Sequence, residues 1–264
     1  MIPKLALEFP QAQTIDEVIE QLSDIITRSR QEQSRLGFFA ALYRIVTIKV
    51  KEGINTGRFD DGARMEQFDV TFANRYLNAL QRFRLNEPPS RCWLVAFEAA
   101  ASWRPLILQH LLLGINAHIN FDLGIAAAQI APGAQLPLLK HDFDEINAIL
   151  ASLVNQVQGE IDELSPWLAL LDRIGGKTDE AIINFSLDKA RAQAWRVAQR
   201  LAALNPDQWG PELNQLDREA SVIGHLVRDP GFWLSTGLLV IRLRESNDIP
   251  KIIDVLSQTS TAGV

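Results

Sequence analysis

Apolar residues recur every three or four positions along most of the chain, which is the spacing of one face of an α-helix. The first such run begins at Thr14 and Glu17, which have the spacing of a capping box at a helix start. A helix over residues 14–33 is therefore predicted. Its apolar face consists of Ile15, Val18, Ile19, Leu22, Ile25 and Ile26.

The next apolar segment, residues 38–50, fits two kinds of structure. Its β-branched residues Ile45, Val46 and Ile48 favour a buried strand by propensity. No partner strand is predicted elsewhere in the chain, so a helix is the preferred interpretation.

Capping and helix-breaking residues divide the rest of the chain into further helices. Asp60 or Asp61 can cap a helix that runs to about residue 83, and Asp142 with Glu145 repeats the capping-box spacing. The other predicted helices cover residues 93–101, 105–129, 142–164, 165–174, 179–204, 211–228 and 232–243.

The linkers are short, and neither a repeat nor a low-complexity segment occurs. We therefore predict an all-α fold, a single domain over residues 1–264 with about eight to ten helices. A buried helix over 105–129 is expected at its centre. Residues 1–13 and 257–264 are expected to be loosely ordered.

The stretch over residues 109–129, QHLLLGINAHINFDLGIAAAQ, is apolar almost all the way round a helix. Residues 105–130 are apolar enough to be tested as a membrane span, but the polar residues among them favour a buried core helix and no transmembrane segment. Polar groups in a core must be paired, so these positions mark a buried polar or metal site. They are His110, Asn116, His118, Asn120 and Asp122.

Part of this polar set has the spacing of metal ligands. Each four-residue step of an α-helix advances about 40° around the axis, so His110, His118 and Asp122 lie along one slowly drifting stripe. His141 follows a loop that can bring the chain back toward them. The four residues predict a site for a divalent metal ion, either zinc, manganese or iron.

Asp142 and Asp144 are the predicted catalytic residues beside this metal site, as a base or as supports of the ligands. Two alternatives remain open for the polar stretch: a structural hydrogen-bonded network, or a metal-free pocket for a small molecule. Asn116 and Asn120 lie on a second stripe and are expected to bond neighbouring helices.

Composition and charge argue against some classes of partner and favour a cellular location. The net charge is -6 and basic residues form no stripe, so no nucleic-acid partner is expected. The single cysteine, Cys92, cannot form an internal disulfide, and the first residues lack the apolar run of a signal peptide. A cytoplasmic location is expected.

Two segments, TGRFDDGARMEQFDVTFANRYLNAL and LQHLLLGINAHINFDLGIA, resemble an uncharacterised bacterial all-helical family of unknown function. That resemblance covers about residues 35–230 and implies a fold without an activity. The His141-Asp142 doublet, with further His and Asp residues, is weakly similar to HD-type metal-dependent phosphohydrolases. In that family the doublet ends a helix, whereas here it is predicted to begin one.

The predicted function is a metal-dependent hydrolase whose small-molecule substrate is a phosphoester or a lipid-like compound. The alternatives are a non-catalytic helical protein that binds a small molecule, and a polar network with a structural role alone.

Overall fold

The computed structural model of the protein describes residues 10–150, 153 and 186–258. These residues form helices and no strand, so the all-α prediction is confirmed. Residues 38–50 belong to a helix, as preferred. The helix predicted over 165–174, and parts of those predicted over 142–164 and 179–204, lie outside the described residues.

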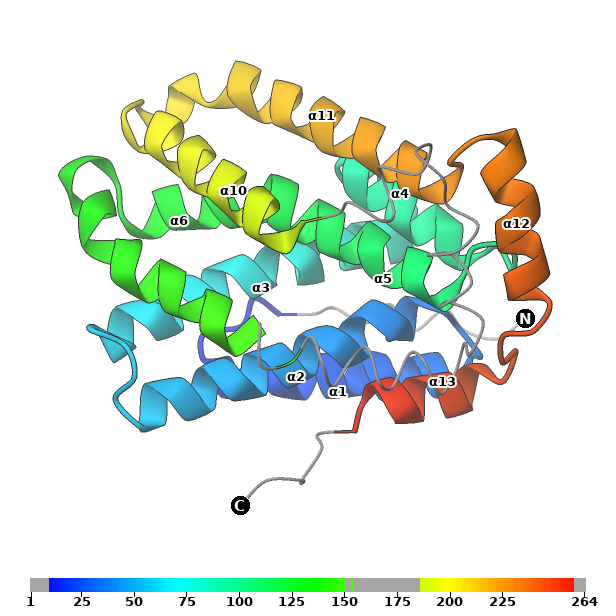
Figure 1. The fold of residues 1–264 in the computed structure, drawn as a ribbon. Coiled ribbons are helices and arrows are strands. Elements are labelled where there is room, and N and C mark those ends of the chain that lie inside the picture. Colours follow the sequence, from blue (N-terminus) through cyan, green and yellow to red (C-terminus); the bar gives the residue numbers. More distant parts are fainter. Residues whose placement is uncertain (1–9, 151–152, 154–185, 259–264) are drawn as a thin grey trace.

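A central helical segment passes through the middle of the molecule (Figure 1). It consists of α5 (Ile107–Asn116), a π-helical segment η1 (Ala117–Leu123) and α6 (Gly124–Ile130). Helices contact it on several sides, which confirms the central buried helix. They are α2 (Leu36–Asn55), α3 (Gly62–Arg84), α4 (Arg91–Ala100), α10 (Leu187–Ala202) and α11 (Gly210–Arg228).

Three further labelled helices belong to the described part of the bundle, in addition to a helix that begins at residue 140. α1 (Ile15–Gln31) packs on α2 and α3, while α12 (Phe232–Arg242) follows α11. The periodicity of the sequence does not predict α13 (Ile249–Leu256), which packs against α1 and α2. Asp248 caps α13 by accepting a hydrogen bond from the backbone N–H of Lys251 at 3.0 Å.

Two of the predicted helix starts are confirmed. The Thr14 hydroxyl accepts a hydrogen bond from the backbone N–H of Glu17 at 3.2 Å. Of the two candidate caps of α3, Asp61 has this role, because its carboxylate accepts from the backbone N–H of Arg64 at 3.0 Å.

The capping box predicted at Asp142 and Glu145 is wrong. Residues 133–139 form a 3-10 helix, and residues 140–150 continue it as an α-helix, so Asp142 already lies inside a helical turn. Its carboxylate instead accepts hydrogen bonds from the backbone N–H groups of Asp60 and Asp61, at 2.6 and 3.3 Å. Asp142 therefore fixes the loop that precedes α3.

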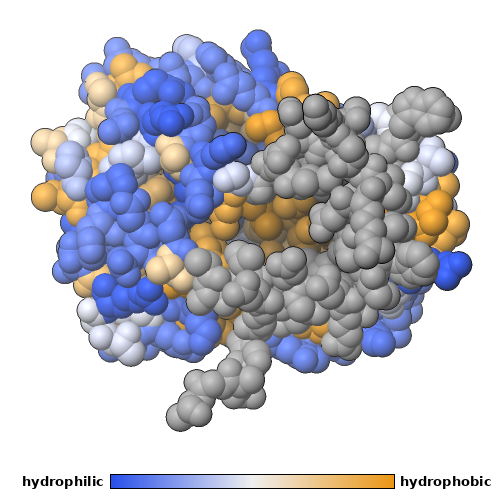
Figure 2. Space-filling view, in the orientation of Figure 1, coloured by the Kyte–Doolittle hydropathy of each residue, from blue (hydrophilic) through white to orange (hydrophobic). Residues whose placement is uncertain are grey.

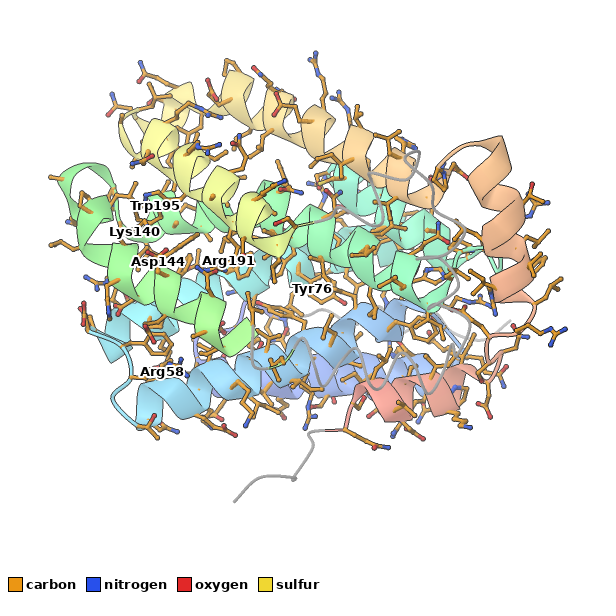
Figure 3. All side chains as sticks on the ribbon, in the orientation of Figure 1. Arg58, Tyr76, Lys140, Asp144, Arg191 and Trp195 are labelled. Carbon is orange, nitrogen blue, oxygen red and sulfur yellow. The ribbon has the colours of Figure 1, made fainter. Side chains whose placement is uncertain are left out.

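Residues 140–150 pack against α10 through charged and aromatic side chains (Figure 3). Arg191 donates a hydrogen bond to the Phe143 carbonyl, and its guanidinium lies 4.5 Å from the centre of the Phe143 ring. The Lys140 ammonium lies 5.4 Å from the centre of the Trp195 ring. These contacts hold the helix over residues 140–150 beside α10.

One continuous cluster of buried apolar side chains includes residues from α1 to α13. The helical segment Ile107–Ile130 is long and apolar enough to cross a membrane, yet 83% of its most apolar stretch is buried inside the protein. The segment is thus the core of the bundle. Hydrophilic side chains cover much of the face seen in Figure 2, and hydrophobic ones are visible in a hollow near its middle.

The chain before α1 is held in place from residue 10 onward. Ala12 is buried, and the Asn74 side chain both accepts a hydrogen bond from its N–H and donates one to its carbonyl, at 2.9 and 2.8 Å. The other segments predicted to be loosely ordered, residues 1–9 and 259–264, lie outside the described residues.

Candidate functional site

A hydrogen-bonded network around the Asp122 carboxylate lies where η1, α3 and α4 meet. One carboxylate oxygen accepts a hydrogen bond from Arg75 Nε at 2.8 Å, and the other accepts from Trp93 Nε1 at 2.7 Å. The Asp122 side chain is only 2% exposed. A carboxylate tolerates such burial when a cation and good donors compensate its charge, as they do here.

His118 lies behind this carboxylate, with its Nδ1 atom 3.5 Å from Oδ2 of Asp122. Its ring stacks on Phe72 with centroids 3.5 Å apart and also contacts the Tyr43 ring at 4.5 Å. Burial lowers the pKa of His118 more than the Asp122 carboxylate raises it, and Arg75 lowers it further. The imidazole is therefore neutral at physiological pH, and no residue in the described part of the chain bonds its Nε2 atom.

His110 and His118 do not share one site, because they lie eight residues apart in the same helical segment. At a rise of about 1.5 Å per residue, this places them roughly 12 Å apart along the helix axis. His110 packs edge-on against Phe38 of α2, with centroids 5.8 Å apart. Burial, aided by the charges of Arg35 and Arg242, lowers the pKa of His110 to about 3.

His141, the fourth predicted ligand, belongs to a different cluster at the start of residues 140–150. Its Nδ1 atom lies 3.2 Å from Oδ2 of Asp60, and ligand atoms of His141, Asp60 and Asp142 all lie within 4.8 Å of one another. Among residues 10–150, 153 and 186–258, this is the one group of three or more His, Cys, Asp or Glu residues whose ligand atoms approach one another in this way. The structure thus divides the four predicted ligands between separate places.

The donor types of this cluster suit zinc, manganese or iron, because imidazole nitrogen and carboxylate oxygen bind all three metals. Asp60 and His141 are largely exposed, whereas Asp142 is buried and also binds Arg64 Nη2 at 2.8 Å. Asp144, the other predicted catalytic residue, forms an ion pair with Lys140 on the surface. A His/Asp group able to hold a metal ion is present, and His141 is the predicted ligand it contains.

A cleft of about 380 Å³ opens beside the Asp122 network, and we call it the Asp122 cleft. Arg75, Asn78 and Arg82 line it from α3, while Trp93 lines it from α4. Gln11, which precedes the Ala12 residue held by Asn74, completes one side. The Asp122 carboxylate and its two hydrogen-bond donors are therefore all part of the wall.

Two other polar side chains, Asp69 and Tyr43, are buried in the core. Burial, with a smaller effect of Glu66, raises the pKa of Asp69 to about 7. Burial raises the pKa of Tyr43 well above its usual value, and the carboxylates of Asp69 and Asp122 add to this effect. The core beside the cleft therefore contains several groups that resist ionisation.

The sequence analysis missed the residues from other helices that surround Asp122 and line the cleft. The sequence of α3 did contain a signal, since Arg75, Asn78 and Arg82 recur at helical spacing beside an apolar face. Trp93 gave no such signal, because it is one of six tryptophans in the chain. The expected bond from Asn116 to a neighbouring helix is confirmed, at 2.8 Å to the Ala220 carbonyl. Asn120 instead donates to Oδ1 of Asn116 at 2.9 Å, within its own helical segment.

Comparison with known families is informative for most of the chain. The profile of a family of unknown function, DUF5995, matches residues 15–230. The chain belongs to this family. No curated protein and no solved structure matches it.

Membership of DUF5995 agrees with the resemblance to an uncharacterised helical family. The weaker similarity to HD-type phosphohydrolases is not shown by the family match. The matched residues include α3, α4 and η1, so the Asp60, His141 and Asp142 group lies within the DUF5995 region, as does the lining of the Asp122 cleft apart from Gln11.

Proposed function

We propose that this DUF5995 protein binds a small polar molecule in the Asp122 cleft. The observation that carries the proposal is a cleft of about 380 Å³ whose wall includes a buried carboxylate fixed by two donors. Pockets for small molecules have volumes of roughly 300 to 1,000 Å³ and hold a few precisely placed polar groups.

The polar side chains of the cleft support this function. Thr71, Asn78 and Gln129 line the cleft, and their side chains have no hydrogen-bond partner in the part of the chain that the structure describes. Their hydroxyl and amide groups are available to a ligand as donors and acceptors. The adjoining π-helical segment adds a feature that occurs frequently at functional sites.

The proposal is tested by measuring the thermal stability of the protein against a collection of neutral and charged metabolites. A ligand that binds only the folded state raises the midpoint of unfolding. Asn78→Trp fills the exposed mouth of the cleft and should abolish the shift. Gln67→Trp, an equally large change at an exposed position of α3 outside the cleft lining, should preserve it.

Binding that persists in Asn78→Trp would place the ligand elsewhere and overturn the proposal. The absence of any binding compound, in a collection that spans sugars, nucleotides, amino acids and organic acids, would also overturn it.

A second candidate function is metal-dependent hydrolysis of a phosphoester, favoured by the convergence of Asp60, His141 and Asp142. We propose that Asp60 and His141 supply the ligands, because their side chains are exposed and their donor atoms lie 3.2 Å apart. Asp142 contributes an oxygen that also accepts a backbone hydrogen bond. The chemistry that such an ion supplies is activation of water for attack on the phosphorus.

Calorimetric titration with zinc and manganese tests the candidate, together with hydrolysis of para-nitrophenyl phosphate. His141→Ala should abolish both metal binding and hydrolysis, whereas replacement of the exposed His225 by Ala should change neither. Equal metal affinity in the wild type and His141→Ala would contradict this function.

A further inference from the structure

We infer that the ligand of the Asp122 cleft carries an anionic group, a carboxylate or a phosphate, which Arg75 and Arg82 bind. This inference rests on the binding function proposed above and adds the chemical class of the ligand. It follows from the spacing of the cationic side chains, their free donors and the charge of the lining.

The cationic side chains lie along one face of α3. Arg75, Asn78 and Arg82 are three and four residues apart, which places them on successive turns of the same helical face. All three line the cleft. An anionic group within the cleft can therefore contact guanidinium groups on two turns, with an amide between them.

Arg75 keeps donors for a ligand although it already binds Asp122. Its Nε–H donates to Oδ1 of Asp122 at 2.8 Å. In the described residues no acceptor is bonded to either of its terminal nitrogens, Nη1 and Nη2. The planar pair of N–H groups at that end matches two oxygens of a carboxylate or phosphate. Asp122 thus orients Arg75 and leaves its outer edge for a ligand.

Arg82 is held only weakly by its neighbours. Its nearest acidic partner is Glu87, at 3.8 Å, and the two side chains are 47% and 59% exposed. An exposed pair at this distance contributes little, because solvent screens it and both side chains are mobile. Glu87 does not line the cleft, so an anion bound in the cleft can replace Glu87 as the partner of the Arg82 guanidinium.

The charge of the lining favours an anion over a cation. Arg75 and Arg82 face a single lining carboxylate, Asp122, whose oxygens both accept hydrogen bonds. The cleft therefore carries an excess of positive charge on a chain whose net charge is -6. Local charge of one sign in a concave site attracts ligands of the opposite sign.

The volume of the cleft places the anionic group on a larger polar molecule. A space of about 380 Å³ exceeds what a single phosphate or carboxylate fills. The amide of Asn78 and the hydroxyl of Thr71 are suited to hydroxyl or amide groups on the rest of the ligand. Sugar phosphates and hydroxy acids have this combination of groups.

The test is calorimetric titration of the full chain with inorganic phosphate and, separately, with succinate, at low ionic strength. Either anion should bind the wild type, and comparison of the two shows which chemistry is preferred. Arg82→Gln should weaken binding about tenfold, because it removes a charge-assisted interaction. Arg218→Gln, which removes the same charge from an exposed position on α11, should leave the affinity unchanged.

One outcome separates this inference from the proposed binding function, and two others would overturn the inference. If neutral compounds bind in a way that Asn78→Trp abolishes, while Arg82→Gln has no effect on any ligand, the anionic class is wrong and the binding function stands. If no compound binds and neither anion does, both proposals are overturned. Equal weakening by Arg82→Gln and Arg218→Gln would also overturn the inference, because it would reflect overall charge alone.

Discussion

Asp122 shows how one residue joins three helices through charge and hydrogen bonding. Its replacement by Ala leaves the Trp93 N–H without an acceptor and Arg75 without its carboxylate in a mostly buried position. Breaking one side of a buried charged pair costs several times more than an exposed pair contributes. We expect Asp122→Ala to lower the free energy of unfolding by about 3 to 5 kcal/mol, measured by urea denaturation.

The matched control for this prediction is Asp229→Ala. Asp229 forms an ion pair with Arg228 on the surface, where its side chain is 72% exposed. Loss of such a pair should change stability by less than about 1 kcal/mol. A loss of similar size in the two variants would show that the Asp122 network contributes little to stability.

Contacts between residues close in the sequence can be predicted from it better than contacts between distant residues. The i,i+4 spacing of His118 and Asp122 predicts that the two side chains are neighbours, and they are. Arg75 and Trp93 lie 47 and 29 residues from Asp122 in the chain, so only the packing of α3 and α4 brings them to it. The His141 cluster needs Asp60, which is 81 residues away and shows only capping potential in the sequence.

Most helices follow from the period of the apolar residues, because a helix in a bundle must bury one face. Departures occur where tertiary contacts compete with local signals. Asp142 has the sequence of a cap but binds a distant loop, and the π-helical segment has no apolar period of its own that distinguishes it from an α-helix. The short α13 spans too few turns for periodicity to identify it.

Close packing between α6 and α10 depends on the absence of a side chain at Gly124. A Cβ atom there would lie 2.5 Å from the Ala194 carbonyl oxygen and 2.9 Å from Val197, so the two helices would have to separate. Gly124→Ala should therefore destabilise the protein by about 1 to 3 kcal/mol, although Ala has the higher helix propensity. Thermal or urea unfolding measures this loss.

Gly210→Ala serves as the reference, because a Cβ atom at Gly210 would meet nothing within 4 Å. Stability should stay the same or increase by a few tenths of a kcal/mol. If Gly124→Ala behaved in the same way, the α6 and α10 contact would be shown to be adjustable.

The stability of the whole molecule should depend on pH through its buried histidines. His110 has a pKa of about 3 in the folded protein against an ordinary 6.5, so between these values the unfolded chain binds the additional proton. Stability is therefore complete above about pH 6.5 and decreases as the pH falls. At pH 5 this one group should have reduced the free energy of unfolding by about 2 kcal/mol.

Urea denaturation of the wild type and His110→Leu measures this effect, at pH values from about 4.5 to about 8, which bracket the ordinary pKa of histidine. The variant should lose about 2 kcal/mol less between pH 7.5 and 5. Asp69 acts in the opposite sense, because its folded pKa of about 7 exceeds the ordinary 3.8 and its contribution falls as the pH rises. Since both proteins contain Asp69, its contribution cancels in the comparison, and identical pH profiles would contradict the prediction.

The π-helical segment gives the cleft a way to change during evolution. Residues 117–123 hold more residues per turn than the α-helices on either side, so deletion of a single codon there would let the segment continue as a regular α-helix. The helices before and after would keep their places in the bundle, while Phe121 and Asp122 would turn to new directions at the cleft wall. One small genetic event would thereby exchange the ligand-facing surface and preserve the scaffold.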